Sequence, residues 1–377
     1  MPHAARRHTP YYLSLCAVTK KKSIRPPTLN DVAREADVSL ATAARVLRGD
    51  DYPVTADRTE RVLKAAQKLH YVPNLLARVL KGGSHRSIGL VVGDMSDPYF
   101  GEIAQAVSVT AQSRSLVAMV ANMHRDPELE IMMCRELLEH RVNGVILAGG
   151  GFDQVTHNET LANLVRRLQR MNIVVVALTE RNLPVPCFSA DNEQAGRMAA
   201  EQFLASGHSA VGIIVGPATS EVTRKRVEGS RAAFALAGVI PRVVYTDFSD
   251  TAGEDALDAL VKAEPRITGI IASGDNVGVG VEGRLRAIGR RVPDDVSVIS
   301  IGHTYFGRLA YPKLTAVDVR LAECSAAAVN YIADTLDGLK PVSPMLAAVS
   351  LVEGQSLRRV RDQPPTIRVS RRSRATS

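Results

Sequence analysis

Apolar residues recur at every third or fourth position in two short runs between residues 28 and 48, as on one face of a helix. The first run consists of Leu29, Val32, Ala33 and Ala36, and the second of Ala43, Val46 and Leu47. Between them, residues 36–39 leave room only for a tight turn, in which Asp37 tolerates a left-handed backbone and Ser39 can cap the next helix. Two short helices joined in this way form a helix-turn-helix, whose second helix can lie in the major groove of DNA.

Two further helices follow this pair. Thr55 can cap the first of them, and its apolar stripe repeats the same spacing at Val62, Ala65, Ala66 and Leu69. After Pro73, Asn74 can cap a second helix that ends before Gly82. A helix of about eight residues is too short to be stable alone, so it needs a symmetry mate, DNA or both as a partner. The alternative for this segment is a simple linker turn.

From Ser87 the pattern changes to short apolar runs that alternate with amphipathic segments. We expect strands over residues 88–92, 117–121, 145–147, 174–177, 211–215, 243–245, 269–272 and 296–300. We expect helices over residues 100–114, 127–141, 194–206, 226–237, 253–263 and 276–288. Strands of this length that alternate with helices form parallel sheets with crossover helices. The pattern predicts a small all-α head and an α/β body of two doubly wound subdomains, with a ligand site at the carboxyl ends of the strands.

Charge is distributed unevenly along the 377 residues, which carry a net charge of +8. Residues 1–86 contain 16 Lys and Arg against 7 Asp and Glu, and residues 357–377 contain 7 against 1, so the middle of the chain is acidic. A basic front end on an acidic body suits a module that binds a polyanion such as DNA, although solvated charged surfaces are the alternative. No apolar run is long enough to cross a membrane, so no membrane partner is expected.

The cysteines Cys16, Cys134, Cys187 and Cys324 lie far apart and match no disulfide or zinc spacing. We therefore expect a cytoplasmic protein without a metal site. The apolar stretch near residues 11–18 is short, contains two tyrosines and leads into Lys20-Lys21-Lys22, which is unlike an export signal. Residues 1–25 and 357–377 are instead expected to be disordered basic extensions.

A series of motifs in the chain resembles the lactose-repressor/galactose-repressor family of bacterial transcription factors. They occur in the family's order over residues 26–356: TLNDVAREADVS, YVPN with ARVL, IGLVV, DPYF, ADNEQAG, GHSAVGIIVGP, RVEG, SGDN, VPDDVSVI and PKLTAV. The resemblance implies a dimeric repressor that binds a pseudo-palindromic double-stranded DNA operator. It also implies a body of periplasmic-binding-protein type, in which a small-molecule effector sits between two lobes and controls operator binding.

These observations predict five parts of the chain. After the extension at residues 1–25 come a helix-turn-helix domain over 26–72 and a hinge helix with its linker over 73–86. A two-lobed effector-binding and dimerisation domain occupies 87–356, and a basic tail occupies 357–377. The first lobe is expected to contain about 87–187 and 314–341, and the second about 188–313 and 342–356. No leucine heptad follows residue 356, so a dimer rather than a tetramer is expected.

The exposed start of the second helix is the expected DNA-reading surface. We expect base contacts from Leu40, Ala41 and Arg45, and phosphate contacts from Thr28, Ser39 and Thr42. Arg45 is the one candidate for a bidentate bond to guanine, with a solvated helix charge as the alternative. The resemblance adds the hinge residues Asn74, Ala77 and Leu80, of which the leucine wedges into the minor groove and kinks the duplex. The family often has serine in place of Ala44, so one phosphate contact is expected to be missing.

The effector site is expected from the resemblance. Arg226 and Asp275 match the positions that bind hydroxyls or a ring edge of the small molecule; the alternatives are a surface charge and a helix cap. Tyr99, Phe100 and Phe248 would form apolar walls, unless they belong to the core. Further candidates are Asp94, Ser220 and Asp191, the last of which can instead cap a helix. His303 stands where the family commonly has an acidic residue, and Gly354 stands where an arginine is usual.

Two other functions are alternatives to a transcriptional regulator. Gly278-Val-Gly-Val-Glu-Gly283 fits the dinucleotide fingerprint GxGxxG, but it lies inside an expected helix and no acidic residue follows the next strand. A sugar-binding transport receptor would need an export signal and would lack the head. We therefore expect no enzyme, no catalytic residues and no cofactor. A sugar or sugar derivative is the expected effector and a purine the lesser alternative, with induction and corepression both open.

Overall fold

The computed structural model describes residues 25–48, 53–71, 86–149, 151–152, 154–247 and 251–360. The chain divides into two units between His85 and Arg86, and each is described by itself. The predicted basic extensions fall almost wholly outside the described residues. The hinge segment with Asn74, Ala77 and Leu80 lies outside them too, as does Phe248.

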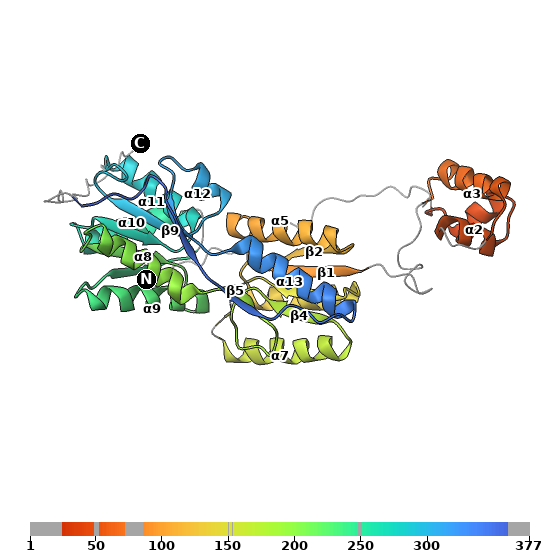
Figure 1. Ribbon diagram of the computed structural model, residues 1–377, viewed down its shortest axis with the longest axis horizontal. Coiled ribbons are helices and arrows are strands. Elements are labelled where there is room, and N and C mark those ends of the chain that lie inside the picture. The colour runs from red at the N-terminus through yellow and green to blue at the C-terminus, as the bar shows by residue number, and fades with distance from the viewer. Residues whose placement is uncertain are drawn as a thin grey trace, which may run out of the picture. The chain divides into compact units, whose positions relative to one another are not determined.

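In the described part of the first unit, three helices surround a small apolar core (Figure 1). They are α1 (Leu29–Glu35), α2 (Leu40–Arg48) and α3 (Ala56–Lys68). Thr28 and Asp31 form a capping box at the start of α1, and Asp37 takes the left-handed backbone (φ 50°) at the turn before α2. The Ser39 hydroxyl accepts a hydrogen bond from the Thr42 amide, so it caps α2 as predicted. Thr55 precedes α3, but its side chain makes no capping bond.

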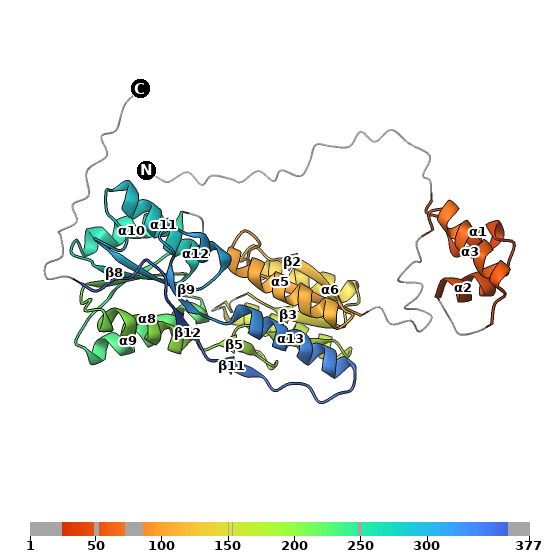
Figure 2. The same cartoon turned by 45° about the horizontal axis from the view of Figure 1, so that its top comes forward.

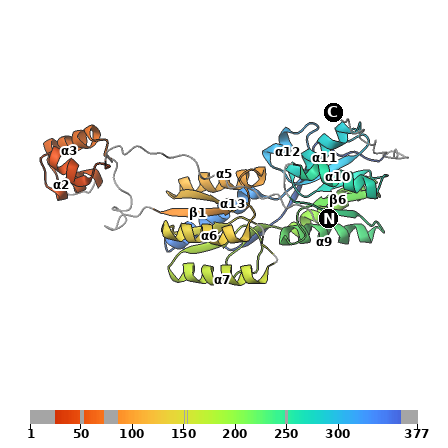
Figure 3. The same cartoon turned by 180° about the vertical axis from the view of Figure 1, so that it is seen from behind.

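The first lobe of the second unit is a parallel four-stranded sheet in the order β2-β1-β3-β4. Its strands are β1 (Ser87–Val92), β2 (Val117–Asn122), β3 (Gly144–Leu147) and β4 (Val174–Ala177). Its helices are α5 (Pro98–Ser113), α6 (Pro127–Glu139), α7 (Val155–Arg170) and α13 (Leu321–Leu336). Two apolar clusters cover the two faces, one formed with α5 and α13 and the other with α6 and α7 (Figures 2 and 3). Strands β1, β3 and β4 are buried on both faces almost throughout, so they are continuous apolar runs rather than alternating ones, whereas the edge strand β2 is partly exposed.

The second lobe contains a six-stranded sheet in the order β12-β10-β9-β8-β6-β7. Its strands are β6 (Val211–Val215), β7 (Arg242–Tyr245), β8 (Gly269–Ala272), β9 (Ser297–Gly302), β10 (Thr315–Asp318) and β12 (Ser350–Val352), of which only β12 is antiparallel to its neighbour. Its helices are α8 (Asn192–Ala205), α9 (Glu221–Leu236), α10 (Ala252–Ala263), α11 (Asp275–Ala287) and the short α12 (Tyr305–Leu309). Helices α8 and α9 cover one face, and α10 and α11 cover the other.

The chain crosses between the lobes at three places, and here the predicted lobe boundaries are wrong. Strand β10, expected in the first lobe, pairs with β9 in the second sheet. Strands β5 (Phe188–Ala190) and β11 (Met345–Ala347), expected in the second lobe, pair with each other, and Phe188 and Ala347 belong to a core cluster of the first lobe. Strand pairing is a long-range property, so the order of elements along the chain does not show which sheet a strand joins.

Helices α7 and α13 were not predicted, and α9 begins five residues before its predicted start at Arg226. In α9 the Ser220 hydroxyl accepts a hydrogen bond from the Thr223 amide, which moves the helix start toward the amino terminus. Arg226 therefore lies within the helix rather than at its first turn. The glycines of the GxGxxG sequence lie within α11, where Gly280 packs against Gly253 of α10. Of the three, only Gly280 serves close packing of these two helices: a Cβ on Gly278 would meet Leu314, and one on Gly283 would meet nothing within 4 Å.

Candidate functional site

A cavity of about 310 Å³ lies between the two lobes of the body. It is formed where the strands end, with Gly93 and Ala148 after β1 and β3, and Ser273 and Ile301 at the ends of β8 and β9. The amino-terminal turns of α5, α9 and α11 also reach it. Ligand sites of doubly wound sheets lie at such carboxyl ends, and the volume suits a small molecule.

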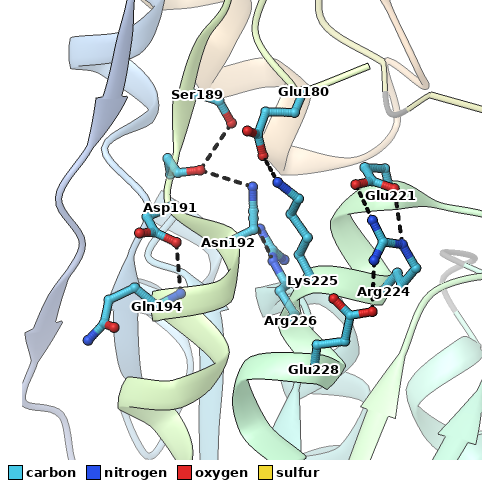
Figure 4. Close-up of polar contacts among 11 residues, drawn as sticks. Glu180, Ser189, Asp191, Asn192, Gln194, Glu221, Arg224, Lys225, Arg226 and Glu228 are labelled. Atoms are coloured by element: carbon cyan, nitrogen blue, oxygen red, sulfur yellow. Dashed lines mark hydrogen bonds and ion pairs between the residues drawn. The ribbon is translucent and has the colours of Figure 1, made fainter. Parts of the chain in front are cut away.

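Arg226 lies on α9 beside Asn192 of α8 (Figure 4). It lines the cavity and is only 5% exposed. Its Nε donates to Asn192 Oδ1 at 3.0 Å and its Nη1 to the Ser273 carbonyl at 2.6 Å. Among the residues that the structure describes, Nη2 makes no hydrogen bond. Burial lowers the pKa of the guanidinium below its usual value, and the neighbouring Tyr99 and Asp275 oppose this shift only in part. The side chain is thus fixed on one side and can offer the N–H groups of Nη2 to a ligand.

Asp275 lines the same cavity and is 3% exposed, but its carboxylate is already engaged. Ser300 Oγ donates to one oxygen, and the amide and hydroxyl of Thr304 both donate to the other, the hydroxyl at 2.7 Å. The helix cap of α11 is Gly274, so Asp275 is not the cap. Gly302 and Gly307 approach the carboxylate so closely that a Cβ on Gly307 would lie 2.8 Å from Asp275 Cγ.

Two oppositely charged residues, Asp97 and Arg125, line the first-lobe wall of the cavity and were not among the predicted site residues. Arg125 Nη2 donates to Asp97 Oδ2 at 2.8 Å, and its guanidinium lies 5.5 Å from the centre of the Phe100 ring. Asp97 also caps α5 by accepting from the Tyr99 amide, and burial raises the pKa of its carboxyl. Asp97 was visible in the DPYF motif, but the partner that makes it a wall residue comes from the distant loop before α6.

The structure brings together part of the predicted effector set. The cavity is lined by Tyr99, Phe100, Ser220, Arg226 and Asp275.

The remaining described candidates, Asp94, Asp191 and His303, do not line this cavity. Asp94 accepts from Ser96 in a turn, and Asp191 caps α8 through the Gln194 amide, the alternative foreseen for it. His303 has a left-handed backbone (φ 65°) and lines a separate surface groove. Its position therefore does not replace an acidic contact in the cavity, and its neighbour Thr304 lines the cavity instead.

Groups of the two lobes contact each other beside the cavity. The backbone of Phe152, from the first lobe, forms an antiparallel bridge with Ser220 of the second. Lys225, next to Arg226 on α9, forms an ion pair with Glu180 of the first lobe (Figure 4). Groups from both lobes thus contact each other next to the cavity.

In the head, the start of α2 presents the predicted DNA-reading residues. Leu40 is 42% exposed and Ala41 is exposed, whereas Arg45 is half-buried. The hydroxyls of Ser39 and Thr42 lie 2.8 Å apart, and that of Thr28 donates to Asp31. The hydroxyls proposed as phosphate anchors thus also hold the ends of their own helices.

Within the described parts of the chain, no group of three His, Cys, Asp or Glu side chains is placed to hold a metal ion. Among the helices described, none combines the length and apolar character needed to span a bilayer.

Two family models match the chain. Residues 28–74 match the lacI family of bacterial regulatory proteins, and residues 85–364 match the periplasmic binding proteins and sugar binding domain of the LacI family. The ribose operon repressor of Halalkalibacterium halodurans is 30% identical over 306 residues, which are 81% of this chain and 89% of that protein.

Solved structures resemble the fold closely. The lac repressor dimer bound to operator and the anti-inducer ONPF superposes with a TM-score of 0.77 at 23% identity, covering 88% of this chain and 99% of that one. The complex of the transcriptional regulator CelR with cellobiose superposes with a TM-score of 0.63 at 26% identity, covering 88% and 99% of the two chains.

Proposed function

The chain belongs to the lacI family of bacterial regulatory proteins, and from this premise we propose that a carbohydrate in the interlobe cavity controls its binding to a pseudo-palindromic operator. It is a DNA-binding transcriptional regulator with a helix-turn-helix head, and its relatives are regulators rather than enzymes. We also propose that it catalyses no reaction and acts in the cytoplasm, where the operator is.

The observation that carries the proposal is the buried Arg226. A guanidinium fixed by Asn192 and Ser273, with one nitrogen left for a ligand, is suited to hydroxyl oxygens of a sugar. A purine would need a flat aromatic face, and one of the rings that line the cavity, that of Phe100, has the Arg125 guanidinium over it. These contacts favour a polyhydroxylated ring over a nucleobase.

A thermal-shift screen of carbohydrates and nucleobases tests the effector directly. A ligand at 100 times its Kd stabilises the folded protein by about 2.7 kcal/mol, a readily measured shift. A sugar that stabilises the chain and changes its retention of operator DNA in a gel-shift assay would support the proposal. Stabilisation by nucleobases alone would exclude it. The sign of the sugar's effect on the gel shift separates induction from corepression.

The proposed base readout rests on few side chains, so we propose that Leu80 contributes strongly to affinity as a minor-groove wedge. Replacing Leu80 by alanine is expected to weaken binding to the cognate operator at least tenfold, because an apolar wedge stabilises the kinked duplex. Fluorescence anisotropy at fixed salt measures this, with thermal unfolding as a check on the fold.

Leu236→Ala is the matched control, since Leu236 is an exposed leucine (87%) on α9 and its loss is expected to leave operator binding unchanged. Equal affinity of Leu80→Ala and the wild type for the cognate site would refute the wedge.

We propose that the chain forms a homodimer, in which a second copy docks on the surface of α12 and α5. These helices contact each other (Figure 2), and the surface exposes Val109, Leu309 and Tyr311 at 55%, 78% and 83%. Large apolar side chains left exposed on and next to two adjoining helices support an association surface here.

Replacing Leu309 by glutamate is expected to weaken the dimer at least tenfold, because a charge would be buried at the interface. Analytical ultracentrifugation of the full chain measures the dissociation constant. Leu236→Glu places the same charge on α9 and is expected to leave it unchanged. An unaltered dimer in Leu309→Glu would move the interface elsewhere.

A further inference from the structure

Glu102 of α5 joins the two lobes through a second-lobe helix. Its Oε1 accepts a hydrogen bond from the Tyr305 amide at 2.7 Å and another from Arg308 Nη2 at 3.1 Å. Tyr305 and Arg308 both belong to α12, whereas α5 is packed in the first lobe. The carboxylate side chain is 27% exposed and the Arg308 side chain 47%, so the ion pair between them is partly screened by water. The hydrogen bond from the Tyr305 amide therefore constrains α12 more than the ion pair with Arg308 does, because it fixes the position of the backbone.

The preceding amide, that of Thr304, bonds to a residue that lines the cavity. Thr304 donates both its amide and its hydroxyl to Asp275, which is buried and lines the cavity. Successive amides, at Thr304 and Tyr305, thus bond to two different carboxylates, one inside the cavity and one on the other lobe. Gly307 presses against the Asp275 carboxylate, which leaves α12 little room to shift while Asp275 stays in place.

We propose that α12 is a relay that couples the occupant of the cavity to the contact between the lobes at Glu102. A ligand group that takes the Asp275 carboxylate away from Thr304 displaces the start of α12, and with it the Tyr305 amide that Glu102 needs. The coupling runs in both directions, since a contact that favours one position of α12 also favours one arrangement of Asp275. The inference rests on the proposed effector cavity, but it assigns Glu102 and Thr304 as positioning residues outside the proposed sugar contacts.

Amide hydrogen exchange on the full chain, without DNA or sugar, tests the relay. In Glu102→Ala, exchange in a peptide covering residues 303–309 is expected to rise at least fivefold. Glu102→Gln retains an acceptor for the Tyr305 amide and is expected to raise it less than twofold. Glu159→Ala is the matched control, because Glu159 is an exposed glutamate on the first-lobe helix α7. Exchange of the α7 peptide is expected to stay constant in the Glu102 variants, which excludes general loosening.

The cavity end of the relay is tested by Thr304→Val, which removes one hydrogen bond to Asp275 and preserves the shape of the side chain. Exchange at residues 303–309 is expected to rise at least threefold, and the double variant with Glu102→Ala to exchange no faster than Glu102→Ala alone. Unchanged exchange in Glu102→Ala, or additive effects of the two changes, would overturn the relay. Because no sugar or operator is present, such a failure is distinguishable from a failure of the proposed function.

Discussion

Replacing Arg226 by alanine is expected to weaken binding of the effector sugar at least 100-fold. The change removes the guanidinium that faces the cavity and leaves Asn192 and the Ser273 carbonyl without their donor. A 100-fold loss corresponds to about 2.7 kcal/mol, which is within the range of a charge-assisted hydrogen bond to a buried ligand. Isothermal titration with the carbohydrate found by the thermal-shift screen measures it, and operator release or retention by that sugar is expected to disappear at the same concentrations.

The neighbouring Arg224 provides the matched control. It lies on the same helix but forms surface ion pairs with Glu221 and Glu228 (Figure 4). Arg224→Ala is expected to bind the sugar as the wild type does. Arg226→Lys is expected to bind the sugar with an affinity between those of Arg226→Ala and the wild type, because a compact ammonium lacks the planar fork with which the guanidinium reaches Asn192 and Ser273 through separate nitrogens. If folded Arg226→Ala retained the wild-type affinity within threefold, Arg226 would not be an effector contact.

Local patterns in the sequence were sufficient for much of the fold, because burial and helix geometry act over short distances. The capping box at Thr28 and the left-handed Asp37 depend only on residues within one turn. Helix α7 has an apolar stripe at Leu161, Leu164, Val165 and Leu168, so this helix could also have been predicted from the spacing of its apolar residues. In α13 the buried side chains are largely small, such as Ser325 and Ala328, so its pattern is weaker.

The candidate site shows where such reasoning stops. Arg226 and Asp275 were named by motif, and both line the cavity. Their hydrogen-bond partners lie far away in the sequence: Asp275 accepts from Thr304, and Arg226 donates to the Ser273 carbonyl. The Asp97–Arg125 pair was missed for the same reason, since α5 and the loop before α6 meet only in the folded lobe. A residue type and its spacing can therefore nominate a ligand contact, whereas its partners come from the tertiary structure.

The carboxyl of Glu282 is expected to make the stability of the body depend on pH. Glu282 lies on α11 and is 4% exposed, and within the described residues its Oε1 has no hydrogen-bond partner. Burial raises its pKa to about 8, against an opposing effect of the nearby Arg286. The folded protein therefore keeps this proton at pH values where the unfolded chain has lost it.

The sign of the effect follows from proton binding. Between about pH 4.5 and pH 8 the unfolded state binds fewer protons at Glu282 than the folded state does, so the free energy of unfolding falls as the pH rises. The favourable contribution is complete below the unfolded pKa and is lost by the time the pH passes the folded one. Glu282→Gln keeps the shape without the ionisation, so it is expected to be more stable than the wild type by roughly 2–4 kcal/mol at pH 8.5 and by little at pH 5.

Urea unfolding of the full chain at both pH values, followed by circular dichroism, measures this difference between the two proteins. Glu139→Gln is the control, because Glu139 is exposed at the end of α6 and its replacement is expected to give the wild-type dependence on pH. A constant offset between Glu282→Gln and the wild type at the two pH values would mean that Glu282 finds a compensating partner. If Glu282→Gln instead becomes more stable relative to the wild type as the pH rises, the buried Glu282 carboxyl, which lies outside the cavity, destabilises the folded state at neutral pH.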